Sequence, residues 1–299
     1  MGKIIANVVI KGGGAKTTSS LNIAYGLSKE GFRTILIDMD SSANASKTLM
    51  IKEKLSDDFV EIFQNKYDEL KKDKKDIANY MLGAEALLYA TQDKKETVVY
   101  IENVLQEKAD VHEAIRKTKY KNLDVIPSSD ELAGISEYLM RHYKMQALKN
   151  ITDILRKEYD YIIIDNAPVE SALMYNVFNA CHQKDDTILI PIKTDRDGLS
   201  GVANTIDRIH NWYIKIVGMQ EIPCDIKILA TMKNRNKLED SVVQTAHKVF
   251  GKNMYHNTIR YQAKPIIDAS LEGKILLECT TSNVKKDYEN LLKEILKKS

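Results

Sequence analysis

The sequence predicts an α/β fold in which a mostly parallel, twisted sheet is flanked by helices on both faces. Short runs of apolar, often β-branched residues recur without polar interruption. Such runs are typical of strands that are buried on both faces, as in parallel sheets. Segments with helical spacing separate the runs, as Leu21, Ala24 and Leu27 do after the first run. This alternation of strand and helix is the pattern of an α/β domain.

Six apolar runs are the candidate strands, at residues 4–10, 34–37, 123–126, 161–164, 187–192 and 226–230. A further helix is expected where Val202, Ile206 and Ile209 share one helical face. We expect one domain over residues 1–299, because the strand and helix pattern runs through most of the chain.

Residues 50–96 depart from this alternation, and charged side chains are concentrated at 67–76. The apolar residues in between keep partial helical spacing, which favours helices with one solvated face over disorder. They are Phe59, Ile62, Phe63, Ile77, Tyr80, Met81, Leu87 and Leu88. We therefore predict a charged helical insertion within the domain. A role in docking a partner stays open beside that of a simple solvated surface.

The overall charge excludes a protein that is basic throughout its surface. The chain has 44 basic and 42 acidic residues, and its formal net charge is +2. Affinity for DNA would have to come from a local patch. Hydrophobic residues make up 43% of the chain and charged residues 29%, which is the balance of a globular protein with a sizeable core.

The cysteines are few and widely spaced. Cys181, Cys224 and Cys279 form no CxxC pair, so we expect free thiols and neither a disulfide framework nor a metal cluster within the chain. The apolar segment 1–10 is short and leads directly into glycines, and no apolar stretch approaches 20 residues. These features predict a cytoplasmic protein.

A glycine-rich loop lies between the first strand and the first helix. Its residues are Lys11, Gly12, Gly13, Gly14, Ala15, Lys16, Thr17 and Thr18. Glycines let the backbone approach phosphate oxygens closely, and the N-terminus of the following helix adds its positive dipole end. In this setting Lys16 would neutralise the β and γ phosphates, Thr17 would bind Mg²⁺, and Thr18 would contact a phosphate nearer the ribose. The loop therefore predicts binding of ATP with Mg²⁺, and it identifies the expected domain over residues 1–299 as a P-loop NTPase.

The strict P-loop pattern is not met, because Ile10 and Ala15 occupy the two outer glycine positions. The pattern that is met is K-G-G-x-x-K-T, beginning at Lys11. This variant resembles the deviant Walker A motif of the ParA/MinD family of ATPases. The resemblance covers residues 3–49 and again about 98 to the end of the sequence. A left-handed backbone at Ala15, where relatives carry glycine, would cost about 1–2 kcal/mol.

Two acidic sites extend the resemblance. The residues after the second strand, Asp38 and Asp40, resemble the family's D-x-D. The resemblance implies that Asp38 helps to hold Mg²⁺ and that Asp40 orients the attacking water. The run 159–165 has the Walker B form, in which Asp165 would bind Mg²⁺ through water. The loop 41–45 keeps only the Asn-Ala end of the family's P-Q-G-N-A.

By the same resemblance, adenine lies between two loops that follow later strands. The matching positions in this chain are Met232, Asn234, Arg235, Arg260 and Tyr261. Relatives carry a proline where Arg260 stands. We expect either Arg260 or Tyr261 to stack on the base, with plain surface placement as the alternative.

The additional loop lysine, Lys11, carries the mechanistic prediction. In this family it reaches across a two-fold interface to the partner's nucleotide, which implies a homodimer bridged by ATP and weakened by hydrolysis. The catalytic residues implied are Lys11, Lys16 and Asp40. The alternative is that Lys11 contacts only its own loop or solvent.

The ParA branch also implies two macromolecular partners. One is nonspecific DNA, bound by basic side chains at its phosphates, which would place the protein on the nucleoid. The other is a ParB-like centromere-binding protein that stimulates slow hydrolysis. Candidate DNA contacts, chosen by composition, are Lys233, Arg235, Lys237, Lys248, Lys252, Lys285 and Lys286.

The last segment of the sequence is a basic amphipathic helix. Its apolar residues are Tyr288, Leu291, Leu292, Ile295 and Leu296. Packing on the core is favoured, and membrane association is disfavoured because this face has no Trp or Phe. Two other functions stay open: a MinD-like membrane-associated ATPase that uses this helix, and a non-hydrolysing nucleotide-gated scaffold, suggested by Ala15 and the altered loop after Asp40.

Overall fold

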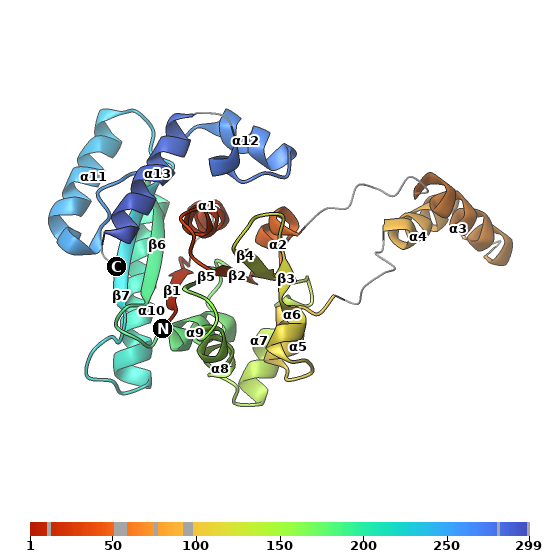
Figure 1. The fold of residues 1–299 in the computed structure, drawn as a ribbon, viewed down its shortest axis with the longest axis horizontal. Helices are drawn as coiled ribbons and strands as arrows, with labels where there is room; N and C mark the ends of the chain where they lie inside the picture. Colours follow the sequence, from red (N-terminus) through yellow and green to blue (C-terminus); the bar gives the residue numbers. More distant parts are fainter. Residues whose placement is uncertain (11–12, 51–58, 75–76, 92–97, 280–281, 298–299) are drawn as a thin grey trace. The chain divides into compact units, whose positions relative to one another are not determined.

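The computed structural model describes residues 1–10, 13–50, 59–74, 77–91, 98–279 and 282–297. The chain divides into two compact units, drawn in Figure 1. Unit 1 comprises Met1–Met50 and Val99–Ser299, and unit 2 comprises Ile51–Val98. The single domain proposed for residues 1–299 stays a prediction.

Unit 1 contains a sheet of seven strands in the order β3-β4-β2-β5-β1-β6-β7. The strands are β1 (Lys3–Asn7), β2 (Thr34–Met39), β3 (Arg116–Lys117), β4 (Leu123–Ile126), β5 (Tyr161–Asn166), β6 (Thr187–Lys193) and β7 (Asp225–Thr231). All neighbouring strands are parallel except β3, which pairs antiparallel with β4. The predicted mostly parallel α/β sheet is confirmed.

Helices cover both faces of this sheet (Figure 1). They are α1 (Lys16–Lys29), α2 (Asn44–Leu49), α5 (Ile101–Leu105), α6 (Val111–Ala114), α7 (Leu132–Arg141), α8 (Ala147–Leu155), α9 (Ala172–Ala180), α10 (Arg196–His210), α11 (Lys237–Phe250), α12 (Ala263–Leu271) and α13 (Asn283–Leu296). Shorter turns are a π-helix, η1 (Asn211–Ile216), and two 3₁₀ helices, η2 (Gly251–Asn253) and η3 (Leu276–Glu278). Helices α1, α2 and α13 pack on one face, and α7 to α10 pack on the other.

The middle stretches of the central strands are apolar because they contribute to two cores. In β5, Tyr161 and Ile163 belong to the core beneath α1 and α13, whereas Ile162 and Ile164 belong to the core on the opposite face. Side chains alternate between the faces of a strand, so a sheet covered on both sides needs apolar residues at every position.

Helix α13 packs against α1. Its residues Tyr288 and Leu291 are fully buried. Leu292 fills a notch at Gly26, where a Cβ atom would lie only 2.1 Å from the leucine Cδ1. The hydroxyls of Ser19 and Tyr288 are 3.1 Å apart and share a hydrogen bond. No described helix is long and apolar enough to cross a membrane.

Unit 2 is a pair of helices, α3 (Phe59–Asp73) and α4 (Asn79–Thr91). They meet through a small apolar cluster of Leu70, Leu82 and Ala86. A salt bridge of 2.8 Å joins Lys74 to Glu85 across the pair. Residues 51–58, 75–76 and 92–97 of the predicted insertion and its flanks lie outside the described residues.

Candidate functional site

The polar residues that were predicted to bind nucleotide and metal come together where parallel strands end. Asp165 at the end of β5 lies beside Asn7 of β1 on one side and beside Asp38 of β2 on the other. The carboxyl ends of parallel strands are where α/β proteins bind ligands. The glycine-rich loop follows β1 at this same edge; Lys11 and Gly12 lie outside the described residues.

The backbone of the loop explains its composition. Gly13 has a φ of +82°, in the left-handed region. At Gly14 a Cβ atom would come within 2.9 Å of the Pro191 carbonyl oxygen, so only glycine fits without a shift. Ala15 has a φ of 57° and precedes α1 without capping it by a side-chain hydrogen bond. The left-handed backbone considered for Ala15 is therefore present, at a cost of about 1–2 kcal/mol. The first N–H groups of any α-helix have no partner within the helix, so the start of α1 suits an anion.

Lys16 is a buried cation at the start of α1. Its side chain and backbone are only 7% exposed. Burial lowers the pKa of Lys16, and the negative charges of Asp165 and Asp40 partly oppose this shift. Thr17 and Thr18 follow it and are half-buried. The structure thus places Lys16 next to both acidic sites predicted from the sequence.

Asp165 carries a buried carboxylate with one unsatisfied oxygen. Its Oδ1 accepts a 2.9 Å hydrogen bond from the Ser20 hydroxyl, which accepts a 2.8 Å bond from the Asn7 amide. Its Oδ2 has no hydrogen-bond partner among the described residues. Burial, and then the negative charge of Asp38, raise the pKa of Asp165 to about 7.

Asp38 is held by the loop that follows it. Its Oδ2 accepts hydrogen bonds from the backbone N–H and the hydroxyl of Ser46, at 2.8 and 2.7 Å, and its Oδ1 accepts from the Asp40 N–H at 3.2 Å. Burial raises the pKa of Asp38 to about 6. Asp40 is half-buried, and its carboxylate accepts a 2.9 Å bond from the Ser42 N–H.

The two buried carboxylates fit a magnesium ion. Neighbouring like charges raise each other's pKa, and a hard divalent cation relieves that repulsion. The unsatisfied Oδ2 of Asp165 supplies an oxygen for such an ion or for its water shell. Thr17 lies close enough to Asp165 to lower its pKa in opposition to burial, so the Thr17 hydroxyl is a further oxygen at the same place.

The two predicted adenine loops lie side by side. The Lys233 N–H donates to the Ile259 carbonyl at 3.1 Å, and the Tyr261 N–H donates to the Lys233 carbonyl at 2.9 Å. Thr231 joins this region to the phosphate loop, because its hydroxyl lies 3.1 Å from the Gly14 carbonyl oxygen. Met232, directly after it, has a left-handed φ of 52°.

The two stacking candidates differ in their surroundings. The Arg260 guanidinium makes a bidentate ion pair with Asp287, with N···O distances of 2.7 and 2.8 Å. Tyr261 is 47% exposed. The arginine side chain is therefore engaged by α13, and the tyrosine is the one presented to solvent beside the loop.

Asn234 is held by Glu239 at the start of α11. The carboxylate accepts from the Asn234 N–H at 2.8 Å and from its amide at 3.0 Å, and it also accepts from the Thr194 hydroxyl. Burial opposes ionisation of Glu239, but these hydrogen bonds prevail and lower its pKa to about 2. Arg235, the last predicted residue of this loop, is exposed.

Motif reading missed the residues that hold the predicted ones in place. Ser20, Ser46, Thr231 and Glu239 all bond directly to a predicted loop or carboxylate. Of these residues, only Ser20 could have been suspected from the sequence, because it is a polar residue on a buried stretch of α1. For the others the pairing arises only from tertiary contact.

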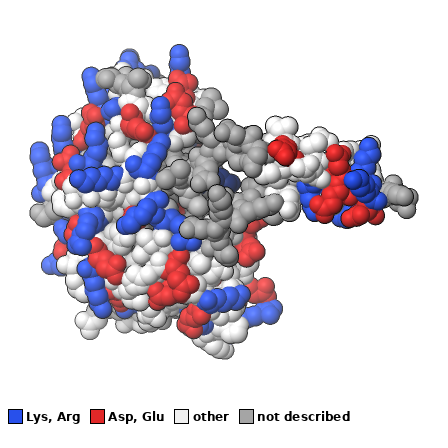
Figure 2. All heavy atoms as spheres, turned by 45° about the vertical axis from the view of Figure 1, so that its right-hand side comes forward, with Lys and Arg blue, Asp and Glu red and all other residues white. Residues whose placement is uncertain are grey.

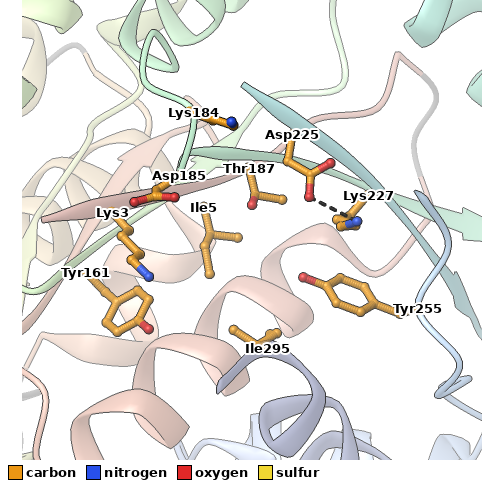
Figure 3. A pocket seen from close by; sticks show the side chains of 10 residues that line it. All are labelled: Lys3, Ile5, Tyr161, Lys184, Asp185, Thr187, Asp225, Lys227, Tyr255 and Ile295. Atoms are coloured by element: carbon orange, nitrogen blue, oxygen red, sulfur yellow. Dashed lines mark ion pairs between the residues drawn. The ribbon is translucent and has the colours of Figure 1, made fainter. Parts of the chain in front are cut away.

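A small pocket of about 100 Å³ lies at the opposite, amino-terminal edge of the sheet (Figure 3). Lys3, Tyr161 and Asp225, which each begin a strand, line it together with Lys227. Lys227 is paired with Asp225 at 2.9 Å and donates to the Lys252 carbonyl at 2.7 Å. None of the predicted site residues lines this pocket.

A family model and several known proteins match this chain. The model of the AAA domain family matches residues 2–219. The chain is 29% identical over 303 residues to the sporulation initiation inhibitor protein Soj of Bacillus subtilis, covering 99% of this chain and 98% of that protein. It is 25% identical over 302 residues to the chromosome partitioning protein ParA of Myxococcus xanthus, covering 100% and 89%.

Solved structures share the fold. A plasmid partition protein of Borrelia burgdorferi bound to AMPPNP superposes with a TM-score of 0.68 at 22% identity, covering 100% of each chain. A single-residue variant of Cyanothece McdA in complex with ATP gives a TM-score of 0.71 at 16% identity, covering 99% of this chain and 96% of that one. The family match spans most of the chain, and the deviant phosphate loop and both acidic sites lie within it. This chain belongs to the AAA domain family and, within it, to the ParA family of partition ATPases.

Proposed function

We propose that this chain is an ATPase that segregates a plasmid, a phage genome or a chromosome. In this proposal it binds Mg-ATP, forms a dimer, coats DNA without sequence preference and is released when a ParB-like partner stimulates hydrolysis. The observation that carries the proposal is the buried Lys16 beside Asp38 and Asp165 at the end of a phosphate loop, in a chain of the ParA family.

The phosphates of ATP would lie at the N-terminus of α1. Backbone N–H groups of residues 13–18 would donate to them, and Lys16 would neutralise their charge. Lys16 is preorganised for this role, because burial leaves it few alternative partners and disfavours an uncompensated charge. Thr18, half-buried one turn into the helix, would contact a phosphate nearer the ribose.

Thr17, Asp38 and Asp165 would hold Mg²⁺, the carboxylates acting wholly or partly through water. When bound, the ion offsets the negative charge that develops on the transferred phosphoryl group. Asp40 would orient the attacking water. The backbone of Asp40 is held in place by Ser128, whose hydroxyl donates a hydrogen bond to the Asp40 carbonyl at 2.7 Å.

Adenine would be held by the paired loops at residues 232–235 and 260–261. Tyr261 is proposed as the stacking residue, because Asp287 engages the Arg260 guanidinium. Met232, Asn234 and Arg235 would line the other side of the base. Glu239 would then position Asn234 without touching the nucleotide.

Lys11 would reach the nucleotide of a second copy, so that ATP bridges a homodimer. DNA would be bound by basic side chains near the C-terminal helices. Among the candidates, Lys248 and Lys252 are exposed, whereas Lys233 is paired with Asp240 at 2.5 Å. Figure 2 shows Lys and Arg side chains spread over the surface of unit 1 and interspersed with acidic ones. A strong dependence of DNA binding on salt is expected for such contacts.

A DNA gel shift tests the proposal. Wild type, Lys11→Ala and Lys16→Ala are each compared with ATP, with ADP and without nucleotide. We expect an ATP-dependent shift for the wild type only, with Lys16→Ala losing nucleotide binding and Lys11→Ala losing ATP-dependent dimerisation. Lys157→Ala, an exposed lysine outside the site, is the matched control. Nucleotide-independent binding by all the variants would refute the ParA mechanism.

The same preparations separate the rival functions. A MinD-like ATPase would pellet with liposomes in ATP and would not bind DNA. The buried apolar face of α13 argues against this, because membrane insertion would have to expose Tyr288 and Leu291. A nucleotide-gated scaffold would bind ATP tightly and release no phosphate, even with DNA and partner present.

A further inference from the structure

Glu102 is a buried carboxylate for which the proposed function has no use. It lies on α5, the first helix after unit 2, and is 1% exposed. Its Oε1 accepts hydrogen bonds from the backbone N–H of Ser129, at 3.1 Å, and from the Ser129 hydroxyl. Its Oε2 has no hydrogen-bond partner among the described residues. A buried acid costs free energy, so its presence here calls for a physical reason.

The loop that Glu102 holds leads to the proposed metal and water carboxylates. The backbone N–H of Ser128 donates to the Ser46 hydroxyl at 3.0 Å, and the Ser128 hydroxyl donates to the Asp40 carbonyl at 2.7 Å. Ser46 donates in turn to Asp38 through both its hydroxyl and its N–H. A second bond fixes the same segment, from the Ile101 N–H to the Pro127 carbonyl at 2.8 Å.

We propose that Glu102 is a positioning residue for ATP hydrolysis: it clamps the loop of Ser128 and Ser129, which fixes Asp38 through Ser46 and Asp40 through its carbonyl. This inference rests on the proposed function and adds a residue to it. No hydrolysis motif includes Glu102, because it reaches the site only through serines on two other segments.

Two features support positioning over a purely structural role. The clamp ends on the carboxylate of Asp38 and on the backbone carbonyl of Asp40, the two residues that motif reading assigned to metal and water. Its bonds converge on serine hydroxyls and N–H groups, which fix direction but bury little area. Loss of such supporting contacts typically costs 10- to 100-fold in metal affinity or activity.

The first test compares Glu102→Ala with Glu102→Gln. The alanine variant removes the acceptor for both Ser129 donors, whereas the glutamine variant keeps one carbonyl oxygen for them. We expect Glu102→Ala to lower kcat by about ten-fold and to raise the Mg²⁺ concentration needed for half-maximal rate by about ten-fold. KM for ATP should stay within about two-fold, because Lys16 and the phosphate loop are untouched. Glu102→Gln should restore most of both losses.

Further variants place the effect on the clamp. Ser46 contacts Asp38 directly, so Ser46→Ala should lower kcat and raise the Mg²⁺ requirement more strongly than Glu102→Ala does. Ser128→Ala removes the bond to the Asp40 carbonyl while its N–H still donates to Ser46, so it should lower kcat with less effect on the Mg²⁺ requirement. Glu137→Ala, an exposed acid on α7, is the control and should change neither.

Binding of a fluorescent ATP analogue during Mg²⁺ titration is measured on the same proteins, so that the inference can be judged even without turnover. If the wild type releases no phosphate, the proposed function fails. The inference about Glu102 is then judged from analogue binding alone: it holds if Glu102→Ala needs more Mg²⁺ than the wild type for binding, and it fails if the two need the same. If the wild type is active and Glu102→Ala, folded by circular dichroism, matches it in kcat and Mg²⁺ requirement, Glu102 has no positioning role. Equal losses in Glu102→Ala and Glu102→Gln, or a loss confined to KM, would also overturn it.

Discussion

The two edges of the sheet treat buried charge in opposite ways. At the amino edge, Arg156 and Asp186 are both fully buried and form an ion pair of 2.6 Å. Asp186 also accepts from the Ile4 N–H at 3.0 Å, and Arg156 donates to the Gly2 carbonyl at 2.6 Å. At the carboxyl edge, two carboxylates of like charge lie side by side, and Oδ2 of Asp165 is unsatisfied among the described residues.

Left-handed backbone at residues other than glycine does not follow this division. Ala15, Ala43 and Met232, with φ values of 57°, 51° and 52°, lie in loops at the carboxyl edge, but Asn122, directly before β4, has a φ of 62°. The two edges differ in charge instead. At the amino edge, buried groups of opposite charge pair with each other, and Arg156 Nε alone of that pair has no hydrogen-bond partner among the described residues. At the carboxyl edge, buried groups of like charge lie side by side, an arrangement that a cation would stabilise.

The largest effect on stability is expected from removing the buried ion pair at the amino edge. Arg156→Ala leaves Asp186 as an uncompensated buried charge, so the free energy of unfolding should fall by about 3–5 kcal/mol. Urea unfolding followed by circular dichroism measures this. Arg33→Ala removes an exposed pair with Asp160 and should cost less than about 1 kcal/mol. Equal costs for the two arginines would remove the distinction drawn for this edge.

At the ligand edge, removing a charge should have the opposite sign. Asp165→Asn relieves the repulsion with Asp38, so at pH 8 the nucleotide-free protein should gain on the order of 1 kcal/mol in free energy of unfolding. ATP turnover should fall on the order of 100-fold, because the proposed metal site loses a ligand charge. Unfolding curves and phosphate release are measured on one preparation. A variant that is both less stable and fully active would contradict the assignment.

The free energy of unfolding should also depend on pH, because ionisation of the two buried carboxyls destabilises the folded state. The pKa values of Asp38 and Asp165 are raised to about 6 and about 7 from 3.8, so between these limits the folded state binds more protons than the unfolded state. Stability of the nucleotide-free, Mg²⁺-free protein should therefore decrease as the pH rises from about 4 to about 7. Thermal unfolding across this range measures the slope. Asp165→Asn should flatten it, and an unchanged slope in that variant would place its origin elsewhere.

The smallest effect concerns backbone strain. Ala15→Gly removes the left-handed penalty of about 1–2 kcal/mol and restores unfolded-state freedom, so a net gain below about 1 kcal/mol is expected. Ala203→Gly, at an exposed position within α10, should instead cost about 1 kcal/mol. Chemical denaturation distinguishes the two signs. A loss of stability in Ala15→Gly would show that the alanine side chain makes contacts that outweigh the strain.

The sequence predicted the strands well because burial on both faces leaves an unbroken apolar run. It missed β3, since Arg116 and Lys117 form a two-residue antiparallel edge with no apolar pattern. Predicted strand ends also shifted: the first apolar run extends to Ile10, whereas β1 ends at Asn7, and the buried residues Val8 and Val9 lead from it towards the phosphate loop.

The sequence suggests candidate site residues where a short motif contains them, as for Lys16 and Asp38, and their roles stay predictions. Pairs formed by the fold were not predictable. Nothing in the local sequence links Glu102 to Ser129, or Arg260 to Asp287, because each pair joins segments that meet only in the folded chain. Residue types alone do not distinguish Arg260 from Tyr261 as the residue that stacks on the base. The ion pair with Asp287 distinguishes them, because it engages the arginine.

Helix α1, which follows the phosphate loop, packs against a helix far along the sequence, α13. Ser19 meets Tyr288 across 269 positions of sequence, and Gly26 is shaped to receive Leu292. Contacts so distant in the chain form late in folding. During synthesis the phosphate loop therefore emerges well before α13, and the helix behind the loop gains its full packing only when α13 has left the exit tunnel. A nascent chain would thus lack a finished carboxyl edge until α13 has been made.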